Sequence, residues 1–117
     1  MDKQFILNKN QVCINSNEYC VYEEFKTYKY IKINTAHIEG SWRGSVSLTM
    51  GNYGGGSLPS PFDKPFINEK ECFEDAINEI QRFLIDNESI DNFKKITNKI
   101  LLAKEKFFPT TIQLKLF

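Results

Sequence analysis

The side chains best suited to chemistry in this sequence are one histidine and three cysteines. His37 is the only histidine, and Cys13, Cys20 and Cys72 form no C-x-x-C pair. A zinc site needs several Cys or His ligands at short spacing, and a disulfide framework needs an even number of cysteines. The pattern therefore favours free, partly buried thiols and a structural histidine, and it predicts no metal and no cofactor. A Cys–His nucleophile pair stays an alternative, because its two members can be distant in sequence.

A glycine-rich stretch invites comparison with loops that bind phosphate. Gly51 and Gly56 have the spacing of a P-loop, but Ser57 stands where that loop requires a lysine. Pro59 and Pro61 keep a helix from starting directly afterwards, so no helix N-terminus is expected to face a phosphate group. Nucleotide binding is therefore not predicted.

Carboxylates recur every four residues at Glu71, Asp75 and Glu79, with Glu74 beside them. In a helix this spacing places them on one face. General acid–base catalysis requires a desolvated carboxyl group with a raised pKa, which the outer face of a helix does not offer. We therefore predict no catalytic residue. The stripe is either solvated surface or an acidic face that binds a basic partner.

Charge is segregated along the chain although the net charge is zero. Residues 63–91 hold nine acidic and three basic side chains, whereas residues 92–117 hold six lysines and one glutamate. A zero net charge argues against a protein that coats DNA nonspecifically. The lysines are most simply solvated surface, but they also define an alternative nucleic-acid-binding surface. The residues assigned to this alternative are Arg43, Lys94, Lys95 and Lys99.

Residues 1–50 are rich in short apolar and alternating segments, which predicts strands. Over residues 42–50 apolar or small residues alternate strictly with polar ones, which is typical of a strand with one buried face. Glu39-Gly40 provides a tight turn to a partner strand within residues 28–38. Two short apolar pieces at 5–7 and 12–14 fit a small hairpin. Residues 17–25 fit either a strand or one or two helical turns.

The second half of the sequence predicts a long loop, two helices and a closing strand. Residues 51–67 contain four glycines and three prolines and are expected to lack regular structure. They either form a binding loop or simply carry the chain from sheet to helix. Amphipathic helices are predicted over 69–86, with Asn68 as its cap, and over 90–107, and a strand over 111–117. The first apolar stripe is Cys72, Phe73, Ala76, Ile77, Ile80, Phe83 and Leu84; the second is Ile90, Phe93, Ile96, Ile100 and Leu101.

These elements predict one α+β domain over residues 1–117, with a small antiparallel sheet packed against two C-terminal helices. Residues 1–7 lack the apolar stretch of a signal peptide, and no apolar run is long enough to span a bilayer. We therefore expect a cytoplasmic protein without membrane contact.

Part of the sequence resembles small proteins of phages and mobile elements. The pattern runs through Trp42-Arg43-Gly44, Gly54-Gly55-Gly56, Pro61-Phe62 and Pro65-Phe66 to Glu71 and Ala76. The size of the chain and its abundance of Lys, Ile and Asn, which indicates a low-GC genome, are similar to those of anti-CRISPR proteins. The resemblance covers about a third of the chain, and anti-CRISPR proteins share no motif from which functional residues can be transferred.

The resemblance implies a non-enzymatic inhibitor that binds an RNA-guided CRISPR nuclease, or its guide-RNA complex, inside a bacterial host cell. The acidic stripe and the long loop would then form the binding surface. Two alternatives are an RNA-binding accessory protein that uses the lysine surface and an immunity protein that binds a toxin. The residues assigned to partner binding are Asn52, Tyr53, Phe62, Glu71, Glu74, Asp75 and Glu79.

Overall fold

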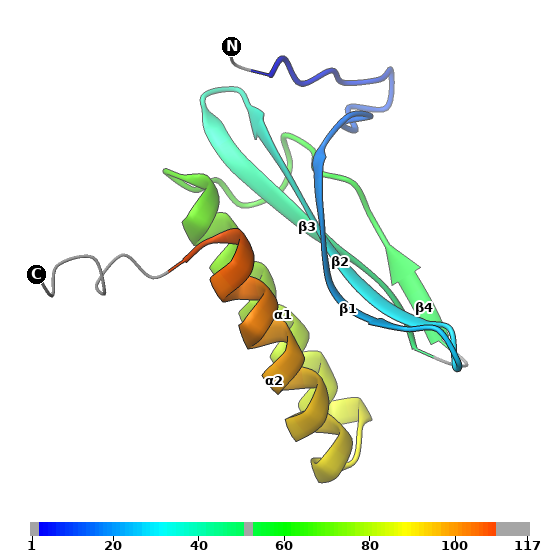
Figure 1. Cartoon of the computed structure of the whole chain (residues 1–117). Helices are drawn as coiled ribbons and strands as arrows, with labels where there is room; N and C mark the ends of the chain where they lie inside the picture. The colour runs from blue at the N-terminus through cyan, green and yellow to red at the C-terminus, as the bar shows by residue number, and fades with distance from the viewer. Residues whose placement is uncertain (1–2, 51–52, 110–117) are drawn as a thin grey trace, which may run out of the picture.

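The fold is α+β, as predicted, and consists of a four-stranded antiparallel sheet covered on one face by two helices (Figure 1). The computed structural model describes residues 3–50 and 53–109, with Tyr53 described by its backbone alone. The elements are β1 (Asn17–Glu24), β2 (Lys29–Ile38), β3 (Ser41–Met50), β4 (Tyr53–Gly56), α1 (Glu69–Asn87) and α2 (Ile90–Phe107). The strands lie in the order β1-β2-β3-β4. Helix α1 packs on β2 and β3, and α2 packs on β1.

The hairpin of β2 and β3 is the one that the sequence predicts. Its turn consists of Glu39 and Gly40, with φ angles of 52° and 81°. The flanking residues Ile38 and Ser41 are paired across the strands. Two consecutive positive φ angles give a two-residue turn the twist that matches the right-handed twist of its strands.

One face of β3 packs on α1 and the core, as its alternation predicts. Val46 and Leu48 contact the core cluster, and Met50 is buried within it. Gly44 lies on the same face, so close to α1 that a Cβ atom at this position would be 2.5 Å from the Cys72 Sγ. The absence of a side chain at Gly44 thus sets how closely α1 approaches the sheet.

The segment that fits either strand or helix in the sequence is strand β1. A β-bulge interrupts its pairing with β2 between Cys20 and Tyr22. The neighbouring residues Val21 and Tyr22 are both buried. Because the bulge breaks the period-two pattern, plain alternation is not visible in the sequence here.

Strand β4 lies inside the stretch predicted to be an irregular loop, so that prediction is wrong for residues 53–56. Gly54, Gly55 and Gly56 pair with Thr49, Leu48 and Ser47 of β3. Glycine has a low strand propensity, and three in succession give no alternating pattern. Pairing with the preceding strand overrides that local preference.

Both helices have the predicted positions, and their buried stripes form the core with the sheet. The Asn68 side chain accepts a hydrogen bond from the Glu71 backbone N–H at 2.8 Å and caps α1, as predicted, and Ser89 caps α2 in the same way. All predicted apolar positions of α1 are buried or half-buried. In α2 the prediction is wrong for Ile90 and Leu101, which are exposed, because α2 rests on the sheet through Phe93, Ile96, Ile100 and Phe107.

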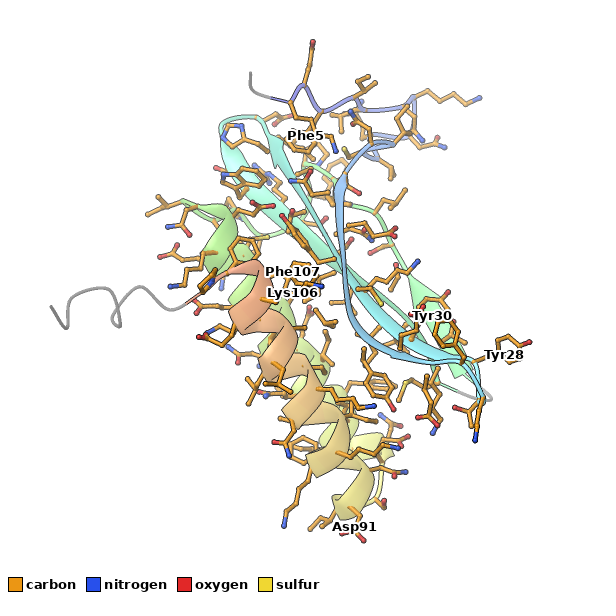
Figure 2. All side chains as sticks on the ribbon, viewed as in Figure 1. Phe5, Tyr28, Tyr30, Asp91, Lys106 and Phe107 are labelled. Carbon is orange, nitrogen blue, oxygen red and sulfur yellow. The ribbon has the colours of Figure 1, made fainter. Side chains whose placement is uncertain are left out.

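The N-terminal segment forms a second, smaller apolar cluster. The predicted hairpin of residues 5–14 is present as an antiparallel bridge between Leu7 and Cys13. Cys13 is buried with Ala36 and Ile38 of β2, and its backbone N–H donates to the Pro59 carbonyl at 2.8 Å. Figure 2 shows Phe5 at this end of the sheet, opposite the hairpin tip that carries Tyr28.

The predicted closing strand at 111–117 lies outside the described residues. Over the range that the structure describes, neither helix has an apolar stretch that could cross a membrane.

Candidate functional site

The cysteines are free thiols with different surroundings. Cys13 and Cys72 are buried and Cys20 is half-buried. The Cys13 Sγ donates to the Asn15 Oδ1 at 3.4 Å, and the Cys20 Sγ donates to the Tyr22 carbonyl at 3.5 Å. His37 is exposed and its ring contacts Trp42 edge-on. In residues 3–50 and 53–109, no cysteine is hydrogen-bonded to His37, and no group of His, Cys, Asp or Glu side chains is placed to hold a metal ion.

Two of the thiols have pKa values raised above that of an ordinary cysteine. Burial is the largest cause that raises the pKa of Cys72 from 9.0 to about 12, and the nearby carboxylates of Asp75, Glu69 and Asp63 contribute in the same direction. Burial, followed by the charge of Glu23, also raises the pKa of Cys20. Because the thiolate is the nucleophilic form, neither group is prepared for covalent catalysis.

The raised pKa of Cys72 predicts a loss of stability at alkaline pH. The unfolded chain releases the thiol proton near pH 9.0, whereas the folded chain holds it up to about pH 12. The contribution of the protonated Cys72 thiol to the stability of the fold is therefore complete below pH 9, and it is lost as the pH rises toward 12. We expect the urea midpoint to fall between pH 8 and pH 10.5, and to fall less in Cys72→Ala. An equal fall in both proteins would contradict this prediction.

The best-connected polar cluster surrounds Glu69, in the first turn of α1, and the sequence did not predict it. The Glu69 Oε2 accepts hydrogen bonds from the Asn17 Nδ2 at 3.0 Å, the Tyr19 OH at 2.8 Å and the Thr35 Oγ1 at 2.7 Å. Burial and the bond to Glu69 raise the pKa of Tyr19. Every donor points to one oxygen, so the cluster joins α1 to β1 and β2. Its role is structural.

Arg43 anchors the loop between β4 and α1. The alternation of β3 predicted an exposed side chain available for nucleic acid, but Arg43 is half-buried. Its Nε donates to the Ile38 carbonyl at 3.3 Å, and its Nη1 donates to the carbonyls of Asp63, at 2.7 Å, and Pro61. The loop covers this part of the sheet face, and the guanidinium group holds the loop in place. Phe62, next to the anchor, is 84% exposed.

Three of the four predicted helix carboxylates form an acidic face on α1, defined here as Glu71, Asp75 and Glu79. Among the described side chains, no ion pair neutralises these three. Glu74 differs, because its carboxylate pairs with the Lys104 Nζ of α2 at 3.2 Å. Glu74 therefore ties the two helices together, while the acidic face keeps its charge.

A groove lies beside the acidic face, between α1 and the β4 edge of the sheet. Its volume is about 680 Å³. Val46, Leu48, Ile80 and Phe83 provide an apolar lining, and Glu79 adds a carboxylate. Of the binding residues predicted from sequence, only Glu79 is among those described in the lining. The described lining consists of Gly44, Ser45, Val46, Leu48, Gly54, Gly55, Ser57, Asp63, Glu79, Ile80, Phe83 and Asn87.

Asp63 was not predicted as a site residue, and it belongs with the acidic face. It lines the groove together with Glu79, and with Asp75 it acts on the pKa of Cys72. Its Oδ2 accepts from the Ser60 backbone N–H at 2.9 Å. The sequence signal was weak, because Asp63 lies in a loop and shares no periodicity with the helix. The predicted contact residue Asn52 and the side chain of Tyr53 lie outside the described residues.

The lysines of α2 are partly engaged within the fold. The Lys95 Nζ pairs with the Glu24 Oε2 at 3.7 Å. The Lys99 Nζ lies over the Tyr22 ring, 5.5 Å from its centroid. Lys94 is exposed. With Arg43 anchoring the loop, the four residues assigned to nucleic-acid binding do not form one surface of free cations.

Comparisons with protein-family models, with curated proteins and with solved structures give no match.

Proposed function

We propose that this chain is a non-catalytic binding protein whose acidic face engages a basic surface on another macromolecule. The observation that carries the proposal is the spacing of Glu71, Asp75 and Glu79 on one face of α1, without an ion pair to any described residue. Like charges at this spacing cost a few tenths of a kcal/mol per pair in a helix. A basic partner offsets that cost and is steered toward the face by its charge.

The partner that we propose is a bacterial defence nuclease of the RNA-guided class. Such nucleases hold the guide–target duplex in a positively charged channel, which complements an acidic helix face. The resemblance of residues 42–84 to proteins of phages and mobile elements supports the same class. Binding there blocks the channel without making or breaking a bond, in the cytoplasm of the bacterial host.

RNA binding through the lysine surface has less support. Lys95 and Lys99 make contacts within the fold, and Arg43 holds the loop. Single-stranded RNA is usually bound by free cations together with aromatic rings on which bases stack. A toxin-binding immunity protein would use the same acidic face, so the choice of partner in the experiment separates it from the nuclease.

Reversing two charges of the acidic face is expected to abolish complex formation. We predict that the wild-type chain co-elutes with an RNA-guided nuclease bound to its guide on a sizing column, and that Asp75→Lys/Glu79→Lys does not. The reason is that two attractive contacts become repulsive, and like-charge juxtaposition at an interface costs several kcal/mol.

A matched control is Glu23→Lys/Glu39→Lys, which changes the net charge by the same amount as the acidic-face variant. Its two substitutions lie on β1 and in the β2–β3 turn, away from the acidic face. This control is expected to co-elute like the wild type. Failure of the wild-type chain to co-elute with nucleases of any RNA-guided type, or equal loss in both double variants, would contradict the proposal. Co-elution with a toxin instead would assign the acidic face to an immunity protein.

A further inference from the structure

The two edges of the sheet differ in how well they are protected from further strands. An unpaired strand edge is a template for another chain, and proteins protect such edges with bulges and charged side chains. The β1 edge has both, because it is bulged between Cys20 and Tyr22 and carries the exposed carboxylates of Glu18 and Glu23. The β4 edge has neither kind of protection in its described side chains.

β4 is also unusually accessible. In the described part of the chain it pairs with β3 alone, and Gly54, Gly55 and Gly56 are exposed (Figure 1). A Cβ atom at Gly55 would meet nothing within 4 Å. A second backbone can therefore approach this edge without meeting side chains of these three residues.

The groove lies along this accessible edge. Gly55 is paired with Leu48, and the Leu48 side chain packs on the helix-facing core. Because residues directly opposite each other share a face of the sheet, a side chain at position 55, or at the residue paired with it in an added strand, points toward the groove. An added strand presents every second side chain to one face. A segment of about four to six residues beside β4 thus places two or three side chains over the groove.

The lining specifies which side chains fit. Val46, Leu48, Ile80 and Phe83 favour apolar groups, and the carboxylates of Asp63 and Glu79 favour cations. The described lining contains no Lys, Arg or His. This charge pattern opposes the phosphates of a nucleic acid and complements a peptide that carries both apolar and basic side chains.

We propose that the β4 edge and the groove bind an extended, basic and apolar peptide segment of a partner protein by strand addition. Main-chain hydrogen bonds to β4 provide affinity, and the groove selects alternate side chains. This inference deepens the proposed function and rests on it for the basic character of the partner. It adds a contact that the acidic face alone does not require.

Selection from a phage-displayed library of random ten-residue peptides, with the full chain immobilised, tests the inference. Enriched peptides are expected to combine Lys or Arg with apolar residues. In fluorescence polarisation, Gly55→Trp is expected to weaken their binding at least about tenfold, because the indole fills the groove. Asn78→Trp, on the exposed side of α1 outside the groove lining, is the control and is expected to bind like the wild type. Thermal melts followed by circular dichroism confirm that both variants are folded.

Absence of enrichment, enrichment of acidic peptides, or equal binding to Gly55→Trp and the wild type would overturn the inference. Binding of a labelled single-stranded oligonucleotide that Gly55→Trp abolishes would also overturn it. The strand-addition inference can also fail while the proposed function stands. If Gly55→Trp still co-elutes with the nuclease while Asp75→Lys/Glu79→Lys does not, the acidic face binds the partner without strand addition at β4.

Discussion

Replacing Gly44 with alanine is expected to lower the free energy of unfolding by about 1–3 kcal/mol, the range for overpacking a well-packed core. The added Cβ would lie 2.5 Å from the Cys72 Sγ, well inside contact distance. Gly44 lies in β3 and Cys72 in α1, where the strand and the helix are in contact. The Cys72 side chain is buried. Either α1 moves away from the sheet or the thiol leaves its position, and each response disturbs the packing that places the acidic face. Urea denaturation measures the change.

Cys72→Ala tests whether the contact between the added Cβ and the Cys72 Sγ causes the destabilisation. The other nearest atoms to the added Cβ are the Asn34 carbonyl oxygen at 3.4 Å and the Cys72 carbonyl oxygen at 3.9 Å, which are ordinary contacts. In the Cys72→Ala background, Gly44→Ala is therefore expected to cost much less than in the wild type. Gly55→Ala, whose Cβ meets nothing within 4 Å, is the matched control and should be nearly neutral. An additive double variant would show that the thiol is not the obstacle.

Glu69→Ala is expected to destabilise the fold by about 2–4 kcal/mol. The substitution removes hydrogen bonds to a charged carboxylate, which are stronger than bonds between neutral groups, and it leaves their three donors without this acceptor. Asn17, Tyr19 and Thr35 all donate to its Oε2. The Tyr19 ring is held among Phe73, Phe107 and Phe108, with centroid distances of 5.4, 5.0 and 5.5 Å, so its hydroxyl cannot easily turn to water. Figure 2 shows Phe107 at the end of α2 that lies near this cluster.

Glu71→Ala is the matched control for this prediction. Glu71 occupies the same first turn of α1 but is exposed, and none of these three donors bonds to it. Both substitutions remove one negative charge near the helix N-terminus, so their difference isolates the hydrogen bonds. Glu69→Gln is expected to lie between them, since its amide oxygen still accepts hydrogen bonds. Equal urea midpoints for Glu69→Ala and Glu71→Ala would contradict the assigned role of the cluster.

The sequence predicted the elements whose side-chain period is strong. Residues 42–50 alternate without interruption, and the stripe from Cys72 to Leu84 repeats with the period of a helix, so β3 and α1 were predictable. β1 was not, because its bulge breaks the alternation. β4 was not, because three glycines carry no periodic signal and the strand exists through pairing with β3.

In the candidate site, too, the features that follow from a local side-chain period were predictable and the others were not. The common face of Asp75 and Glu79 follows from helix geometry alone, and the sequence predicted it. The groove requires β4 to lie beside α1, which no local pattern indicates. Arg43 was assigned to an exposed surface because alternation reports which side of the strand a residue takes. It does not report that a distant loop covers that side.

We propose that the polar side chains of this chain serve contact with another macromolecule and that they make or break no bond. The most direct measurement is DNA cleavage by an RNA-guided nuclease that co-elutes with the chain, titrated with increasing amounts of the chain. We predict that cleavage falls in proportion to the amount added and stops when the two proteins are equimolar. Loss of cleavage at a small fraction of that amount would indicate catalytic turnover, and full cleavage in excess protein would show that no inhibitory contact forms. Either result would contradict stoichiometric inhibition by binding.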